Sequence, residues 1–144
     1  MGNNEIGGAE LLHKIEELWG EPHKDLKTYS GLTLAYIGDA VYDIVVRTIL
    51  VARGNAPVNK LHNEASSIVK AEAQKNSLQK IESLLTEEEM AVYKRGRNSK
   101  SYTTAKNASV TDYRIATGYE ALIGYLYLDG QTDRLLYLIK EGIS

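Results

Sequence analysis

An apolar run over residues 31–51, interrupted by three charged side chains, limits the folds open to this chain. Asp39, Asp43 and Arg47 lie inside the run, and each would cost about 2.5–3.5 kcal/mol at the centre of a lipid bilayer. The run is much longer than a strand of about 5–6 residues, although the β-branched residues at 44–49 would suit one. It therefore predicts a long helix that is buried in a soluble protein.

The rest of the chain is also patterned for helices. Apolar residues recur at three- and four-residue spacing in further segments, which predicts helices over residues 9–19, from 57 to 69, over 78–85, from 86 to 93, over 111–128 and over 132–143. Thr86 and Glu89 form a capping-box pair, and we expect a helix break near Asn76. The pattern predicts an all-α fold with one domain over residues 1–144, in which residues 1–29 are an N-terminal extension with its own helix.

The composition and the local motifs exclude several classes of protein. The 144 residues contain no cysteine, which excludes disulfides and thiolate zinc sites. The three histidines are scattered, and there is no glycine-rich phosphate loop, His-Glu-x-x-His or Gly-x-Ser-x-Gly motif. Residues 1–8 lack the charged start and apolar core of a secretory leader. We therefore expect a cytoplasmic protein without a membrane segment.

Two carboxylates lie in helices that are otherwise largely apolar. Asp39, Asp43 and Arg47 follow one another at four-residue spacing, so they form a single polar stripe along their helix. Asp43 and Arg47 suit a structural ion pair. Glu120 lies in the apolar helix over 111–128, where a carboxylate bears a large desolvation cost unless a cation pairs with it. Asp39 and Glu120 are either satisfied core acids or a functional pair, and only the fold can bring together residues 81 positions apart.

Residues 94–109 are polar and aperiodic, and they predict a basic loop. Five basic side chains and no acid give residues 94–106 a charge of +5, which leaves −7 for the rest of a chain whose net charge is −2. The residues that could contact phosphate oxygens of a ligand are Lys94, Arg95, Arg97, Asn98, Lys100 and Lys106. The alternative is a solvated surface loop. Two carboxylates that we expect to be buried, together with a basic loop and no evident nucleophile, favour metal-assisted attack on a phosphodiester, with magnesium or manganese as the metal.

Three segments resemble one enzyme family. Residues 34–40, Leu-Ala-Tyr-Ile-Gly-Asp-Ala, resemble the signature helix of ribonuclease III, and residues 120–124, Glu-Ala-Leu-Ile-Gly, resemble its second signature. Residues 94–100, Lys-Arg-Gly-Arg-Asn-Ser-Lys, resemble the basic insertion of the small bacterial Mini-III subfamily. The resemblance covers residues 31–143 and leaves no residues for a double-stranded-RNA-binding domain, which is also typical of Mini-III ribonucleases.

The resemblance implies an all-helical ribonuclease III-like endonuclease domain that acts as a homodimer. It implies magnesium-dependent cleavage of double-stranded RNA, with manganese as a substitute, to give 5′-phosphate and 3′-hydroxyl ends. Asp39 and Glu120 match the metal-binding, catalytic acids of the family, and the basic loop would bind the duplex. The biological task implied is maturation of the ends of large-subunit (23S) ribosomal RNA precursors, aided by a ribosomal protein.

The chain departs from the family pattern at three positions. Leu32, Ala35 and Thr117 stand where larger members of the family carry acids, so two of four carboxylates remain. The departures put a second metal ion in question and leave Asp43 and Asp112 as weaker candidates for a compensating role. They also keep two alternatives open, which are a non-catalytic RNA- or ribosome-binding module and a helical domain that only dimerises.

Overall fold

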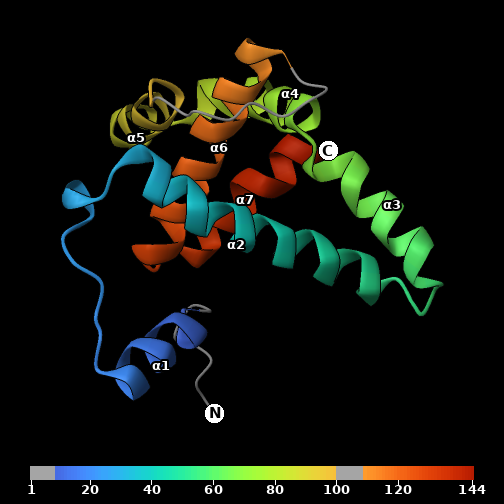
Figure 1. The fold of residues 1–144 in the computed structure, drawn as a ribbon, viewed down its shortest axis with the longest axis horizontal. Helices are drawn as coiled ribbons and strands as arrows, with labels where there is room; N and C mark the ends of the chain where they lie inside the picture. The colour runs from blue at the N-terminus through green and yellow to red at the C-terminus, as the bar shows by residue number, and fades with distance from the viewer. Residues whose placement is uncertain (1–8, 100–108) are drawn as a thin grey trace.

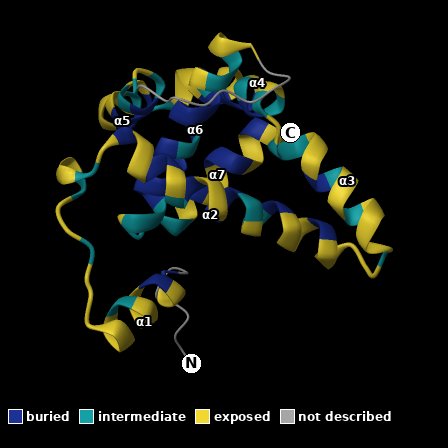
Figure 2. Ribbon diagram, viewed as in Figure 1, coloured by how far each residue is buried: buried dark blue, intermediate teal, exposed yellow. Residues whose placement is uncertain are grey.

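Two long helices cross at the centre of the structure, a computed structural model that describes residues 9–99 and 109–144 (Figure 1). They are α2 (Gly31–Ala52) and α6 (Val110–Leu128). Helix α6 is buried along most of its length and forms the core of the molecule (Figure 2). The described residues contain helices and no strand. The predicted all-α fold is therefore confirmed.

The other helices surround this crossing. In chain order they are α1 (Glu10–Trp19), the short 3-10 helix η2 (Leu26–Thr28), α3 (Val58–Val69), α4 (Ala71–Ile81), the 3-10 helix η3 (Glu82–Leu84), α5 (Glu87–Arg97) and α7 (Thr132–Ile143). Helices α4, α5 and α7 pack against α6, whereas α3 packs against the second half of α2. Helix α1 begins beside the turn that follows α6, where a Cβ atom at Gly130 would lie 3.7 Å from the Ala9 Cβ, and Ala9 and Leu12 are buried.

Side-chain caps fix where the main helices begin. Ser30 accepts a hydrogen bond from the backbone N–H of Thr33 at the start of α2. Thr86 and Glu89 form both bonds of a capping box at the start of α5, as their spacing predicts. Of the described helices, none is both long enough and apolar enough to cross a membrane.

The helix break expected near Asn76 is wrong. The chain turns at Lys70, whose backbone is extended with a ψ angle of 156°, and α4 then runs without interruption through Asn76. The inward face of α4 begins with two buried polar residues, Gln74 and Ser77, before the apolar Leu78. Apolar periodicity therefore could not detect the first turns of this helix.

The basic loop expected over residues 94–109 begins later than predicted. Lys94, Arg95 and Arg97 belong to the last turn of α5, which ends at Arg97 with Asn98 as its C-cap. Gly96 does not stop the helix, because it is the point at which α5 packs on α6. A Cβ atom at Gly96 would lie 2.6 Å from the Ala121 Cβ. Residues 100–108 lie outside the described residues.

A buried ion pair joins the start of α5 to α7. Arg134 donates from Nε to Glu89 Oε2 at 2.9 Å and from Nη2 to Glu89 Oε1 at 2.8 Å. The same guanidinium donates to the Leu84 carbonyl. The hydrogen bonds from Arg134 lower the pKa of Glu89, as does the backbone bond from Thr86. Glu89 therefore serves the capping box and the packing of α7 at once.

Replacement of Arg134 by methionine is expected to destabilise the protein near pH 7 by about 3 kcal/mol, because it leaves the buried Glu89 carboxylate without its cation. The pKa of Glu89 is lower in the folded than in the unfolded chain, so the pair stabilises the fold above the unfolded pKa and this contribution disappears as the pH falls through the folded pKa. Urea denaturation should therefore show a large difference in stability between Arg134→Met and the wild type near pH 7, and a smaller one at about pH 3. An equal difference at both pH values would contradict this role.

Candidate functional site: two carboxylates at a helix crossing

Helices α2 and α6 approach each other so closely that only glycine fits at the contact. A Cβ atom added to Gly38 would lie 1.8 Å from the carbonyl oxygen of Glu120, and one added to Gly124 would lie 2.0 Å from the carbonyl oxygen of Leu34. Each glycine therefore sits directly on the backbone of the other helix. The crossing fixes the positions of the residues next to these glycines, which include Asp39 on α2 and Glu120 on α6.

The structure brings Asp39 and Glu120 together. Burial, a hydrogen bond with the Asp39 side chain and the negative charge of Asp39 raise the pKa of Glu120 to about 8. The two acids differ in their surroundings, because Asp39 is exposed whereas Glu120 is partly covered. The expectation that both acids are buried is therefore wrong for Asp39. It lies at the solvent edge of the crossing, and the buried face of α2 runs through its neighbour Gly38.

A third side chain reaches this pair from α4. Gln74 donates from Nε2 to Glu120 Oε2 at 3.3 Å, and only 2% of its surface is exposed. The sequence interpretation did not single out Gln74. Its spacing of three, four and seven residues from Ser77, Leu78 and Ile81, all buried, would have placed it on the inward face of α4.

The carboxylate pair fits a magnesium ion. Magnesium is usually bound by one or two carboxylates together with water and substrate phosphate oxygens. Two like charges held together, one of them with a raised pKa, form a site where a divalent cation offsets the repulsion. Within residues 9–99 and 109–144, no group of three or more His, Asp or Glu side chains could hold a metal ion. An ion at the helix crossing would therefore have at most two carboxylate ligands from the described residues.

The positions at which the chain departs from the family pattern supply no further carboxylate. Ala35 belongs to the buried face of α2, with 6% of its surface exposed. Thr117 is also buried, and its hydroxyl donates to the Tyr113 carbonyl at 2.9 Å. Leu32 is partly exposed. None of the three offers the negative charge that binds a divalent ion.

The two weaker acidic candidates are each held in an ion pair. Asp43 Oδ2 lies 3.0 Å from Arg47 Nε, which confirms the predicted pair along α2. Asp112 Oδ1 lies 3.2 Å from Lys75 Nζ, so it bridges the start of α6 to α4. Both carboxylates already have a cation as partner.

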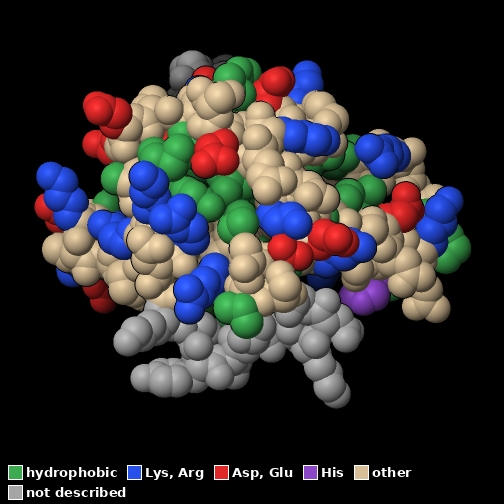
Figure 3. Space-filling model, turned by 90° about the horizontal axis from the view of Figure 1, so that it is seen from above, with side chains coloured by type: hydrophobic (Ala, Val, Ile, Leu, Met, Phe, Trp, Pro, Cys, Tyr) green, Lys and Arg blue, Asp and Glu red, His purple; other side chains and the backbone are tan. Residues whose placement is uncertain are grey.

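The basic residues of α5 have different environments. Lys94 is exposed, whereas Arg97 lies over the Tyr93 ring at 5.5 Å and donates to Asn98 Oδ1. Figure 3 shows Lys and Arg side chains, with acids among them, on the face that includes α4 and α5. Lys100 and Lys106, which were also predicted to contact RNA, lie outside the described residues.

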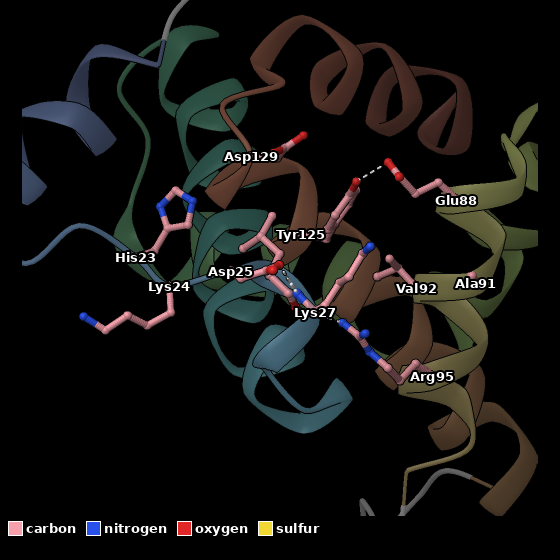
Figure 4. A pocket seen from close by; sticks show the side chains of 11 residues that line it. His23, Lys24, Asp25, Lys27, Glu88, Ala91, Val92, Arg95, Tyr125 and Asp129 are labelled. Atoms are coloured by element: carbon pink, nitrogen blue, oxygen red, sulfur yellow. Dashed lines mark hydrogen bonds between the residues drawn. The ribbon is translucent and has the colours of Figure 1, made fainter.

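Arg95 lines a cavity of about 540 Å³ between residues 23–27 and the helices α5 and α6 (Figure 4). Its Nη2 donates to the Leu26 carbonyl at 3.3 Å, which ties the segment before α2 to α5. On the opposite wall the Tyr125 hydroxyl donates to Glu88. Arg95 is therefore partly engaged in holding the fold together.

Comparisons with known proteins agree with this geometry. The family model described as "Ribonuclease III domain" matches residues 32–131. A protein named Mini-ribonuclease 3 from Clostridium tetani is 52% identical over 84% of this chain and 81% of its own length, and one from Enterococcus faecalis is 52% identical over 84% and 93%. A crystal structure of a Fusobacterium nucleatum protein matches with a TM-score of 0.76 and 32% identity, over 82% of this chain and 96% of that chain. The chain therefore belongs to the ribonuclease III family, and within it to the Mini-ribonuclease 3 proteins.

Proposed function

We propose that the protein is a magnesium-dependent endoribonuclease that cleaves double-stranded RNA. The observation that carries this proposal is the meeting of Asp39 and Glu120 at the crossing of α2 and α6. These two residues would hold the metal ion, and manganese would substitute for magnesium. When bound there, the ion supplies positive charge to the reacting phosphate and makes a water molecule more acidic.

The two acids have different roles in this proposal. Asp39 is exposed, so its carboxylate can face both solvent and the scissile phosphate. Glu120 lies deeper and is bonded to Gln74, so it is the more rigid of the two. Since Ala35 and Thr117 add no carboxylate, the chain's own side chains would hold one ion per site. The products would carry 5′-phosphate and 3′-hydroxyl ends.

The basic end of α5 and the residues that follow it would bind the duplex through its phosphates. The described members of this set are Lys94, Arg95, Arg97 and Asn98, and Lys100 and Lys106 complete it. A-form RNA is recognised mainly by its shape and by phosphate and 2′-hydroxyl contacts, which need no stacking platform. Arg95 would contribute partly, because one of its nitrogens already bonds to Leu26.

Replacement of Lys94, Arg97 and Lys100 by glutamine is expected to weaken binding of RNA duplexes to the same extent whatever the duplex sequence. The dependence of log Kd on log salt concentration should become flatter by about 1 for each lost phosphate contact. Binding of a defined RNA duplex to catalytically inactive Asp39→Asn protein, measured over a series of salt concentrations, provides this slope. A triple variant with an unchanged slope would remove these residues from the RNA interface.

A homodimer, a cytoplasmic location and a role in maturing the ends of 23S ribosomal RNA precursors with a ribosomal protein are part of the same proposal. Large apolar side chains on α2 are compatible with a second copy that covers them, because Tyr36 is 82% exposed and Ile44 is 60% exposed. Light scattering would give the mass in solution. A monomer that still cuts both strands would contradict the dimer.

The direct test is incubation of the purified protein with a defined RNA duplex, with magnesium or with a chelator, followed by mapping of the product ends. Cleavage only with magnesium, leaving 5′-phosphate and 3′-hydroxyl ends, supports the proposal. Tight binding without cleavage in either condition would instead support a non-catalytic RNA-binding module. The missing carboxylates at Ala35 and Thr117 are the observation that favours that second candidate.

A further inference from the structure

A buried amide bridges the junction of α3 and α4 to the carboxylate pair. Gln74 Nε2 donates to the Val69 carbonyl at 2.9 Å and to Glu120 Oε2 at 3.3 Å. Both neighbours of this nitrogen are acceptors, which fixes the orientation of the amide. The backbone bond holds the side chain in place at the turn on Lys70, so its second N–H is presented to Glu120 from a fixed position.

We propose that Gln74 is a positioning residue that holds one oxygen of the Glu120 carboxylate and thereby orients the carboxylate toward Asp39 and a shared divalent ion. This inference rests on the proposed metal site. A neutral N–H donor that bonds to the carboxylate favours its charged form without bringing a positive charge to the site. A lysine or arginine at position 74 would place a cation next to the site and compete with the ion, and a glutamate would add a third negative charge.

The remaining oxygen of the amide argues against a purely structural role for Gln74. Its Oε1 is buried and has no hydrogen-bond partner among the described residues. Burial of an acceptor without a partner is unfavourable. An apolar side chain of similar size would fill the same space between α4 and α6 without this cost. The amide at position 74 is therefore explained better by its hydrogen bonds to Val69 and Glu120 than by packing.

The test uses Gln74→Met, which keeps an unbranched side chain of similar length but removes both donors. Manganese affinity of the free protein, measured by electron paramagnetic resonance of the unbound ion, should fall roughly 10–100-fold, as is usual when a partner of a metal ligand is lost. At a fixed magnesium concentration below saturation, kcat should fall while duplex affinity does not change. Raising the magnesium concentration should recover part of the lost kcat.

Two control variants separate positioning from packing. Gln79→Met makes the same substitution at an exposed position of α4, and Leu78→Val removes one methylene from a fully buried neighbour. Neither should change manganese affinity, although Leu78→Val should lower the melting temperature. Unchanged manganese affinity in Gln74→Met, or an equal loss in Leu78→Val, would overturn the inference. If Gln74→Met does not fold, Gln74→Asn replaces it in the test, because the shorter amide cannot reach both acceptors. Unchanged manganese affinity in Gln74→Asn, or an equal loss in Leu78→Val, would then overturn the inference.

Asp39→Asn, measured in parallel, distinguishes this inference from the proposal beneath it. If Asp39→Asn loses the metal and Gln74→Met retains it, only the positioning role is wrong. If Asp39→Asn retains wild-type manganese affinity, the two-carboxylate site itself is wrong.

Discussion

Asp39→Asn is expected to reduce cleavage of an RNA duplex by at least ~10³-fold, which corresponds to about 4 kcal/mol of transition-state stabilisation. The substitution removes one of the two charges that would hold the metal ion but preserves the size of the side chain. Duplex binding should persist, because the phosphate contacts proposed here come from α5 and the residues after it. The measurement is single-turnover cleavage at saturating protein with a defined duplex and magnesium.

The loss of activity in Asp39→Asn should not come from unfolding. Asp39 is exposed, and its charge helps to raise the pKa of Glu120 to about 8. A carboxyl group whose pKa is raised by folding reduces stability above its unfolded pKa, and the penalty grows until the pH passes the folded pKa. In metal-free buffer above about pH 8, the melting temperature of Asp39→Asn should therefore equal or exceed that of the wild type.

Asp43→Asn is the matched control for Asp39→Asn. It makes the same substitution one helical turn further along α2, where the carboxylate is paired with Arg47. Cleavage by this variant should stay near that of the wild type. Full activity in Asp39→Asn, or equal losses in the two variants, would contradict the assignment of Asp39.

Gly38→Ala is expected to have the largest effect on stability, with a loss of at least ~3 kcal/mol, because overpacking against a rigid backbone is among the most damaging core changes. The added Cβ would lie 1.8 Å from the carbonyl oxygen of Glu120, so α2 and α6 would have to separate. Separation of the helices would also move Asp39 away from Glu120. Urea denaturation and cleavage assays should therefore both detect the change.

Ala40→Val tests whether the effect of Gly38→Ala is specific to the crossing. Ala40 lies two residues further along the same helix and is exposed. The larger valine side chain should therefore cost less than the single methyl group added at Gly38. A Gly38→Ala protein with wild-type stability and activity would show that the close helix contact is not needed to place the two acids.

The sequence was sufficient to predict features that depend on local chemistry. The capping box of Thr86 and Glu89 and the ion pair of Asp43 with Arg47 each form between residues three or four positions apart, and the structure confirms both. The all-helical fold follows from apolar periodicity. Asp39 and Glu120 were selected because a carboxylate is costly in an apolar helix, and the structure brings them together.

Other features depend on contacts between distant segments, and the sequence did not predict them. The polar, aperiodic sequence of residues 94–109 predicts a loop, but Gly96 lies inside α5 at the point where α5 packs on α6. Gln74 was missed because a buried polar residue breaks the apolar pattern of its helix. The exposure of Asp39 depends on the angle at which α2 crosses α6, which no local pattern contains.

The central claim is that Asp39 and Glu120 together bind one divalent ion. Manganese titration of the free protein, followed by electron paramagnetic resonance of the unbound ion, tests it without RNA and without turnover. The wild type and Asp43→Asn should bind one ion per chain with equal affinity, whereas Asp39→Asn and Glu120→Gln should each lose that binding. Wild-type manganese affinity in both Asp39→Asn and Glu120→Gln would contradict the account.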